Sequence, residues 1–508
     1  MQTTANVRHN IIANFAARAW SALMTLAFLP LYIRFLGIEA YGLIGVYVSL
    51  VALLAVLDMG LSTTLTRELA RLSAAPGGEQ EARDLTRTFE LIYWGVGILI
   101  GGGVAMMAPV MARHWLNVEG LAIETVEQSA MIMGLAVALQ WPNSLYSGGL
   151  MGLQRQVLMN IVRAGAATLQ GGGAVLVLWL VSPTIVAYFS WQIVAGALQT
   201  AVMAACLWRS LPSAANHAAF RRQLLERNWR FAGGITGIII LSILLTQTDK
   251  IILSKLLSLE MFGYYALAAA IAGGMNYISS PIFTALFPRL SQAAAGGSNV
   301  EITRLYHQGT QLMTAVVAPV WIIVALFSEE LLTLWFGDSR TASNIHLLVT
   351  LLLTGTALNS IMSLPFALQL AYGWTRLMLY VNSISLTVFV PLLIWLVNGY
   401  GAVGAALAWI SINAGYILVV VPLMHRRLLK ESMGEWYLRD VGLPVALCLG
   451  IGLVVRFAIP VGLQPYAVLL WVISAFALCF LSALLAMSHT RAWVWQLVFP
   501  SANAGTNP

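Results

Sequence analysis

The chain has 508 residues, of which 59% are hydrophobic and only 9% are charged. Soluble domains carry roughly a quarter charged residues, so this composition excludes a water-soluble globular protein and makes the bilayer the solvent. The net charge of +7 does not indicate nucleic-acid binding, because the basic residues are spread over segments that flank apolar stretches.

Apolar stretches that could cross a bilayer recur along the whole chain, and a membrane-spanning helix needs about 20 such residues. The alternating pattern of a β-barrel does not occur, so we predict an all-α polytopic membrane protein with about fourteen transmembrane helices. The first is expected to be a retained helix rather than a cleaved signal peptide. In chain order the predicted spans are 11–33, 42–66, 88–111, 128–150, 158–181, 185–208, 231–254, 262–287, 308–334, 346–370, 377–397, 402–424, 441–459 and 466–487.

These spans form two groups of six, followed by a last pair. With the N-terminus inside, most of the 27 Lys and Arg residues fall in cytoplasmic segments, which predicts that both termini are cytoplasmic. Phe220, Leu224 and Leu225 would share one face of an interfacial helix over 217–230. This helix is expected to anchor the chain on the anionic leaflet, and a specific lipid or partner site is the alternative. The predicted domains are a six-helix lobe (1–208), a cytoplasmic amphipathic linker (209–230), a second six-helix lobe (231–424), and two additional transmembrane helices with a cytoplasmic tail (425–508).

An internal repeat relates the two lobes. When the first group is moved by 221 positions, the segment from Arg34 to Gly42 (RFLGIEAYG) lies over the segment from Lys255 to Gly263 (KLLSLEMFG). Basic, acidic and glycine positions coincide, and both segments form the turn between the first two helices of a lobe. Chance similarity between two short apolar hairpins is the alternative. Transporters with two pseudo-symmetric lobes are built from weak repeats of this kind, with the substrate site between the lobes.

Five of the ionisable residues inside predicted spans stand out, because a charge at bilayer depth costs at least about 2.5 kcal/mol and usually faces a partner or a cavity. Arg18, Asp58 and Arg163 would all lie in the cytoplasmic half of the first lobe. Asp249 and Lys250 would lie near the outer end of the seventh helix. Three bases against two acids favour an anionic substrate over a cationic drug.

The alternatives for these charges are structural. Arg18 and Asp58 could form a neutral pair, and Asp249 and Lys250 could simply reach the outer interface. Arg163 has no obvious acidic partner, and a guanidinium matches phosphate oxygens bidentately. Polar residues share one stripe with Arg18 at helical spacing, although such stripes also serve helix packing; they are Asn10, Asn14, Ser21 and Thr25. The predicted substrate-binding residues are Asn14, Arg18, Asp58, Arg163, Asp249 and Lys250.

No catalytic, cofactor or metal site is predicted. Cys206, Cys448 and Cys479 all lie within apolar spans, which favours neither a disulfide framework nor a metal cluster. A phosphate-binding glycine loop and a nucleophile triad do not occur either. A membrane polymerase, ligase or glycosyltransferase is the rival of a different class, and it would need a larger outer loop with catalytic groups.

Several short motifs, in their order, resemble the polysaccharide transporter family that includes O-antigen flippases. They are LGIEAYG at 36–42, LDMGLS at 57–62, GLQR at 152–155, QTDK at 247–250, FPRLS at 287–291 and GAVGAA at 401–406. The resemblance covers nearly the whole chain. That family belongs to the multidrug/oligosaccharidyl-lipid/polysaccharide (MOP) exporter superfamily, whose members have two six-helix lobes and often two extra C-terminal helices.

The resemblance implies a flippase rather than an enzyme. Its expected cargo is an undecaprenyl-diphosphate-linked oligosaccharide, moved from the cytoplasmic to the periplasmic leaflet of the bacterial inner membrane by alternating access. The partners that it implies are this lipid-linked oligosaccharide, membrane lipids and other polysaccharide-assembly proteins. A lipid II flippase or a drug exporter of the same superfamily is the nearest alternative, and the ion or gradient that would drive transport stays open.

Overall fold

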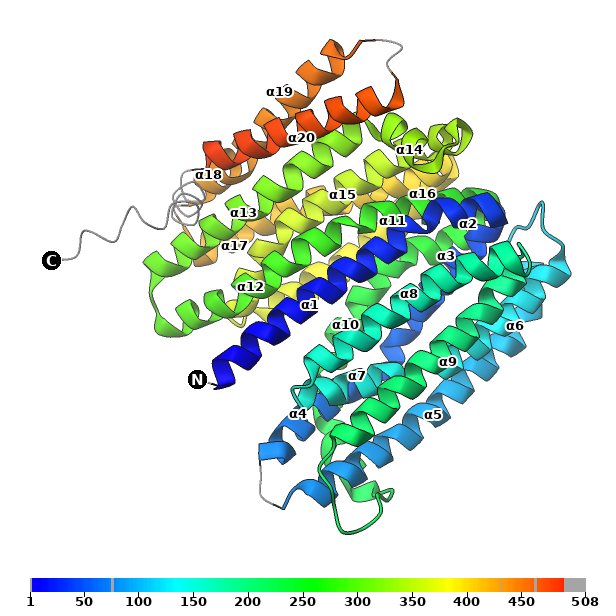
Figure 1. The fold of residues 1–508 in the computed structure, drawn as a ribbon. Coiled ribbons are helices and arrows are strands. Elements are labelled where there is room, and N and C mark those ends of the chain that lie inside the picture. The colour runs from blue at the N-terminus through cyan, green and yellow to red at the C-terminus, as the bar shows by residue number, and fades with distance from the viewer. Residues whose placement is uncertain (1, 75–76, 431, 461–463, 488–508) are drawn as a thin grey trace. The chain divides into compact units, whose positions relative to one another are not determined.

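The structure is a computed structural model that describes residues 2–74, 77–430, 432–460 and 464–487, so the predicted tail 488–508 lies outside the described residues. The described chain is almost wholly helical, as predicted, and divides into two compact units, 1–267 and 268–508. Figure 1 shows the course of the chain. The boundary between the units falls inside helix α11. The division into two six-helix lobes stays a prediction.

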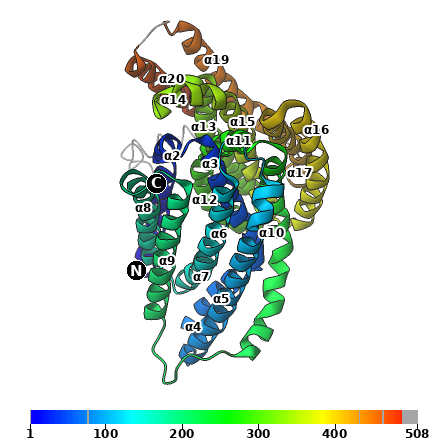
Figure 2. The same ribbon diagram turned by 90° about the vertical axis from the view of Figure 1, so that its right-hand side faces the viewer.

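The first unit contains the helices up to the beginning of α11. They are α1 (Gln2–Ala27), α2 (Leu29–Leu36), α3 (Ile38–Leu54), η1 (Ala55–Asp58), α4 (Leu61–Ala74), α5 (Glu79–Val110), η2 (Met111–Trp115), α6 (Ile123–Gln140), α7 (Asn143–Gly152), α8 (Gln156–Leu180), α9 (Ile185–Ser210), α10 (Arg222–Leu256) and α11 (Leu259–Gly273). α1 packs on α8, α8 on α9, α9 on α6 and α6 on α5. In Figure 2, α5, α6 and α9 lie side by side.

The second unit contains the remaining helices. They are α12 (Met275–Gly296), α13 (Asn299–Leu326), α14 (Ser328–Phe336), α15 (Ser339–Ala371), α16 (Thr375–Gly415), η3 (Tyr416–Val420), α17 (Val421–Leu428), α18 (Met433–Glu435), η4 (Trp436–Gly442), α19 (Leu443–Ala458) and α20 (Pro465–Ala486). α12, α13 and α16 pack on α15, and the C-terminal pair α19 and α20 packs on α13. α13 is thereby the helix that joins the C-terminal pair to the rest of the unit.

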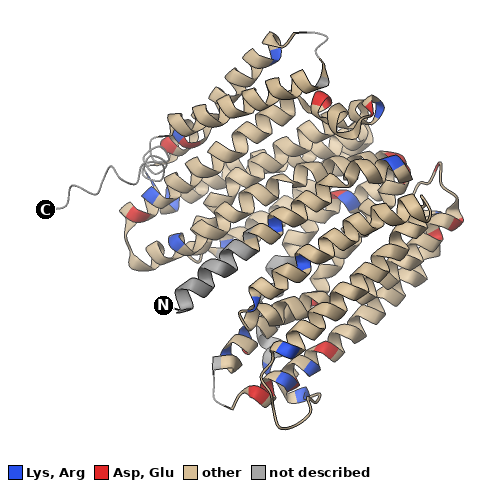
Figure 3. Cartoon of the chain, in the orientation of Figure 1, with Lys and Arg blue, Asp and Glu red and all other residues tan. Residues whose placement is uncertain are grey.

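Eleven helices of the described chain are long and apolar enough to cross a bilayer, and charged residues gather near helix ends (Figure 3). The predicted count of about fourteen is not confirmed. The span 128–150 is divided between α6 and α7 at Trp141 and Pro142, and 231–254 is the second part of α10. The spans 377–397 and 402–424 lie in one helical run, which bends at Gly401 with a φ of 57°.

The interfacial segment differs from the prediction. A helix begins at Arg222 rather than at His217, and it continues to Leu256 without a separate linker helix. Residues 218–221 are not helical because their polar groups bond to α5 instead: the backbone N–H groups of Ala219 and Arg221 donate to Asp84 and Thr88. These hydrogen bonds satisfy the backbone without a helical turn.

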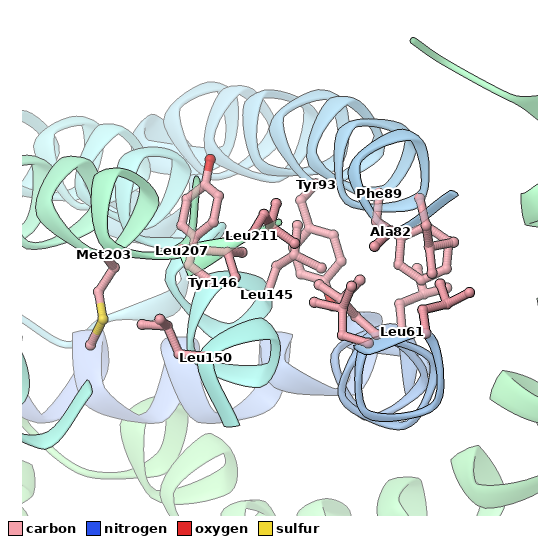
Figure 4. Close-up of a cluster of buried hydrophobic side chains, with 14 of the residues drawn as sticks. Leu61, Ala82, Phe89, Tyr93, Leu145, Tyr146, Leu150, Met203, Leu207 and Leu211 are labelled. Atoms are coloured by element: carbon pink, nitrogen blue, oxygen red, sulfur yellow. The ribbon is translucent and has the colours of Figure 1, made fainter. Parts of the chain in front are cut away.

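A core of leucine and aromatic side chains holds the first unit together. It is formed where α4, α5, α7 and α9 meet, and Tyr93, Leu145 and Tyr146 lie at its centre (Figure 4). In the second unit a comparable core joins α13 to α19 and α20. There each of the two thiols, Cys448 and Cys479, donates to the other residue's backbone carbonyl, and both cysteines are free.

Buried carboxylates on α4 and α5 are paired with arginines. Glu68, just beyond the predicted span that ends at residue 66, accepts hydrogen bonds from Arg67 and Arg71 at 2.6 and 3.0 Å. Burial would raise the pKa of Glu68, but the hydrogen bonds and charges of the two arginines lower it below its ordinary value of 4.5. The folded protein therefore holds this carboxylate ionised more strongly than the unfolded chain does.

Replacing Glu68 with glutamine should accordingly remove one source of acid sensitivity. A lowered pKa contributes stability above pH 4.5, and this contribution is lost as the pH falls through the lowered pKa. We expect Glu68→Gln to unfold at a lower temperature than the wild type at pH 7, and the difference to shrink towards pH 4. Thermal unfolding in detergent measures this. Glu226→Gln is the matched control, because its exposed pair with Arg222 should contribute little; an equal response of the two variants would contradict the prediction.

Candidate functional site

A row of polar side chains joins α1 to α8. Asn14 Nδ2 donates to Gln156 Oε1 at 2.7 Å, and Asn160 Nδ2 donates to Asn14 Oδ1 at 2.5 Å. Further along the two helices, Trp20 Nε1 donates to Thr168 Oγ1 at 2.8 Å. The amides satisfy one another across the two helices, which orients them and fixes the register of α1 against α8.

Arg18 and Arg163 extend this row. Arg18 follows Asn14 by four residues and Arg163 follows Asn160 by three, so each lies about one turn further along its helix. Both side chains are exposed, and their positive charges lie close enough to repel each other. Within the described chain, no ion pair includes Arg163. The structure thus brings Asn14, Arg18 and Arg163 together at one place. Among the described residues, no carboxylate forms an ion pair with the Arg163 guanidinium.

Asp58 lies among hydroxyl groups at the end of η1. Ser62 Oγ donates to it at 2.8 Å, Ser144 Oγ at 3.4 Å, and the buried Tyr93 hydroxyl donates to Oδ1. These partners come from α4, α7 and α5. The pair of Asp58 with Arg18 that the sequence suggested is not among the ion pairs of the described residues. Hydroxyl donors stabilise the carboxylate without neutralising its charge.

Asp249 and Lys250 form a second group, on α10. Lys250 Nζ lies 3.4 Å from Asp249 Oδ1 and donates to the Thr246 carbonyl at 3.0 Å. The other Asp249 oxygen accepts from the buried Tyr265 hydroxyl of α11 at 2.6 Å. The Lys250 ammonium and the Tyr265 hydroxyl each contact one oxygen of the Asp249 carboxylate. These contacts hold α10 against α11 as well as balancing charge.

The two copies of the predicted repeat contact each other inside the first unit, where α3 crosses α11. A Cβ atom on Gly42 would lie 2.5 Å from the Leu259 carbonyl oxygen, and one on Gly263 would lie 2.3 Å from the Ile38 carbonyl oxygen. A shift of 221 residues turns one contact into the other. Gly45, moved by the same shift, becomes Ala266, and a Cβ on Gly45 would lie 2.5 Å from Ala266 Cβ.

Reciprocal contacts of this kind are the signature of a two-fold relation between two segments, in which residue i touches j and the equivalent of j touches the equivalent of i. They support the internal repeat over chance similarity. They also explain the two glycines, because only a residue without a side chain allows the backbones to approach this closely.

Segment 117–120, which follows η2, forms hydrogen bonds on both sides of the crossing of α3 and α11. Asn117 Nδ2 donates to the Leu257 carbonyl at 3.1 Å, and the Asn117 carbonyl accepts from Leu259 N at 2.8 Å. The Glu39 carboxylate of the first repeat copy accepts from the backbone N–H of Gly120 at 2.9 Å. The turn that precedes α11 is therefore fixed both by the close helix crossing and by hydrogen bonds to segment 117–120.

Several polar partners could not have been named from the sequence. Tyr93 and Tyr265 each donate to an aspartate of the predicted site, and His307 of α13 contacts Asp440 of η4. The only signal available was a polar atom within or beside an apolar span, and the partner in each case comes from another helix. Hydropathy predicts depth in the membrane but not which helices are neighbours.

Residues 7–294 match the family model described as "Polysaccharide biosynthesis protein". Over 405 residues the chain is 23% identical to a protein of Shigella flexneri that is provisionally named an O-antigen transporter, and this similarity covers 79% of the chain and 93% of the relative.

Solved structures share the fold. The lipid II flippase MurJ in an inward closed conformation is similar with a TM-score of 0.66 and 12% identity, over 96% of this chain and 99% of MurJ. An inward-facing multidrug resistance MATE family transporter of the MOP superfamily is similar with a TM-score of 0.64 and 13% identity, over 83% of this chain and 96% of that one. These named proteins are transporters and flippases rather than enzymes.

Proposed function

The chain belongs to the polysaccharide biosynthesis protein family, and from that premise we propose that it is a flippase for lipid-linked oligosaccharides. The cargo of our proposal is an undecaprenyl-diphosphate-linked repeat unit. It moves from the cytoplasmic to the periplasmic leaflet of the inner membrane by alternating access. Both termini are cytoplasmic in this proposal, because most basic residues then lie on the cytoplasmic side.

The observation that carries the proposal is the pair of guanidinium groups on α1 and α8. A charge inside a membrane helix is costly and normally pairs with a partner, yet no carboxylate among the described residues pairs with Arg163, and its neighbour Arg18 repels it. A diphosphate supplies the missing negative charge, and the planar guanidinium fork binds phosphate oxygens in a bidentate geometry.

Neighbouring groups suit the rest of such a cargo. Asn14, on the same row as the arginines, is proposed to contact the sugar next to the diphosphate when the cargo displaces one of its hydrogen bonds to α8. Asp58, held by three hydroxyls, modulates the positive charge of the site. Asp249 and Lys250 are proposed to meet the cargo later, near the outer end of α10.

Lipid II is the second candidate cargo, because the similarity to the lipid II flippase extends over 96% of this chain, whereas that to the MATE transporter covers 83%. Both cargoes carry a diphosphate on a polyprenyl chain, so the arginine pair suits either. The glycan is what distinguishes them.

Flipping in proteoliposomes tests the proposal. The purified chain is reconstituted with a fluorescent undecaprenyl-diphosphate oligosaccharide, and empty vesicles provide the control. Protein-dependent movement between leaflets is expected, and lipid II in parallel vesicles separates the two cargoes. If folded protein moves neither lipid across a range of glycans, the proposal is wrong and an enzymatic role regains weight.

A further inference from the structure

A buried polar cluster lies in the second unit, where α13 meets the segment that leads to the C-terminal helices. His307 Nδ1 of α13 is hydrogen-bonded to Asp440 Oδ2 of η4, and Gln311 Nε2 donates to Asp440 Oδ1 at 2.9 Å. The side chains of His307 and Asp440 are 3% and 0% exposed. Both oxygens of the Asp440 carboxylate therefore accept a hydrogen bond. His307 Nδ1 carries the proton of its hydrogen bond whether the imidazole is neutral or charged.

The other ring nitrogen of His307 is where a proton can come and go. Nε2 is buried and has no hydrogen-bond partner among the described residues, and Glu435 Oε2 lies 4.0 Å away. The Glu435 side chain is 38% exposed, so it connects the buried imidazole with the surface. Arg439 approaches the other Glu435 oxygen at 3.7 Å, which keeps one oxygen directed to Arg439 and the other to His307.

Further polar atoms with unused hydrogen-bonding capacity surround the pair. The Tyr306 hydroxyl, His425 Nε2 and Trp436 Nε1 are all buried and without a partner in the described structure. Their rings are contiguous: Tyr306 packs edge-on against His307 and against His425, which in turn packs on Trp436. A purely structural ion pair would be expected to have its neighbours satisfied, because unsatisfied buried polar atoms are costly.

The balance of charge around Asp440 is set by His307. The titratable groups that face the pair are Tyr306 from α13, His425 from α17 and Glu435 from α18, and Tyr437 of η4 faces Tyr306. In the described part of the chain no lysine or arginine forms an ion pair with Asp440. A proton on His307 Nε2 therefore converts a buried pair of net charge −1 into a neutral one.

The backbone at this place is suited to respond to such a change. Asp440 lies on a π-helical turn, 436–442, and a second π-helical turn, 416–420, leads into the helix that carries His425. Turns of this type are frequent at functional sites. α19 continues directly from the turn 436–442 and packs with α20 on α13, so the His307–Asp440 pair lies where the C-terminal helices join the rest of the unit.

We propose that His307 and Asp440 form a proton-binding site, in which Nε2 of His307 exchanges one proton with water near Glu435 and the occupancy of the site sets the rate of the transport cycle. The N–H bond at Nε2 forms as the O–H bond of a protonated Glu435 carboxyl breaks, and the carboxylate then takes a proton from hydronium, which leaves water; release of the proton runs through the same steps in reverse. The second part of this inference rests on the proposed function, whereas proton binding itself does not.

Proton counting tests the site without any transport. The full-length protein in detergent is brought from pH 8 to pH 6 in weak buffer, and the protons taken up per chain are measured. Asp440→Asn and His307→Gln are each expected to take up about one proton fewer than the wild type. Glu330→Gln, which removes a carboxylate paired with Arg456 in the same unit, should leave the count unchanged.

If folded Asp440→Asn and His307→Gln take up as many protons per chain as the wild type, the proposed proton-binding site is wrong. If neither variant folds, Glu435→Gln takes their place, because its partly exposed side chain can be changed without opening the core; it should slow proton exchange at least threefold, and an unchanged exchange rate would overturn the proposal.

Transport at several pH values tests the coupling. In proteoliposomes with the fluorescent undecaprenyl-diphosphate oligosaccharide, the wild-type rate is expected to change at least threefold between pH 6 and pH 8, and the rate of His307→Gln should not. The same pH profile in both proteins would overturn the coupling. Wild-type protein that moves no lipid at any pH would instead refute the proposed function, and the proton count would still decide the site.

Discussion

Replacing Arg163 with alanine is expected to lower the flipping rate at least about tenfold, because a hydrogen bond to a charged group contributes about 1.5–3 kcal/mol. The same change should leave the protein as stable as the wild type or more so. Arg163 is repelled by Arg18, so its removal takes away a repulsion and no ion pair with a described residue. Lower activity at equal or higher stability is the combination that a binding residue produces and a structural one does not.

Two measurements on the same preparation check this prediction: flipping of the fluorescent lipid in proteoliposomes and thermal unfolding in detergent. Arg163→Lys should retain part of the activity, because it keeps the charge but loses the bidentate fork. Arg113→Ala, which removes an exposed arginine paired with Glu127, is the matched control and should transport normally. If Arg163→Ala and Arg18→Ala both flip normally, the cationic site is assigned to the wrong residues.

The sequence indicated which helices carry these charges but not which residues they contact. The length of the apolar stretches and the positions of the charged residues predicted an all-helical chain. Their spacing of one helical turn placed Asn14 and Arg18 on the same stripe, and in the structure both lie beside α8. The Asp58 carboxylate, in contrast, bonds with the hydroxyls of Ser62, Tyr93 and Ser144. Tyr93 and Ser144 lie outside the predicted span 42–66 that holds Asp58, and spacing along one span carries no information about them.

The same limit explains the His307–Asp440 pair. Both residues lie beside the ends of predicted spans, where titratable residues are ordinary, and 133 positions separate them in the chain. Only the packing of α13 against η4 makes them a buried pair. The repeat at 34–42 and 255–263 is the opposite case, because the glycines that coincide in the sequence are positions at which the structure brings the two backbones close together.

The close crossing of α3 and α11 should make the protein sensitive to larger side chains at Gly42 and Gly263. Leucine at Gly42 or at Gly263 is expected to force α3 and α11 apart, since a Cβ atom would lie 2.5 Å from the Leu259 carbonyl oxygen in one case and 2.3 Å from that of Ile38 in the other. These neighbours are backbone atoms and cannot rotate away. Overpacking of this kind costs about 1–3 kcal/mol, which corresponds to a shift of roughly fivefold to a hundredfold between the packed and the separated crossing.

If alternating access requires this crossing to close and open, both variants should transport several-fold more slowly. The opening itself can be measured with a cysteine at Leu259, which is 1% exposed, in a background without the native cysteines. A maleimide that does not cross membranes should label it faster when Gly263 is leucine. Gly103→Leu is the matched control, because a Cβ at that position of α5 would meet nothing within 4 Å.

The reciprocity of the two contacts makes the prediction stricter than a steric clash alone. Because a shift of 221 residues exchanges the two contacts, Gly42→Leu and Gly263→Leu should slow transport by similar factors. Once one leucine has separated the helices, the second meets less resistance, so the double variant should lose less than the sum of the two single losses. A large effect at Gly263 with a wild-type rate at Gly42 would mean that the crossing is packed for stability on one side only, and that the two copies of the repeat do not move as a symmetric pair.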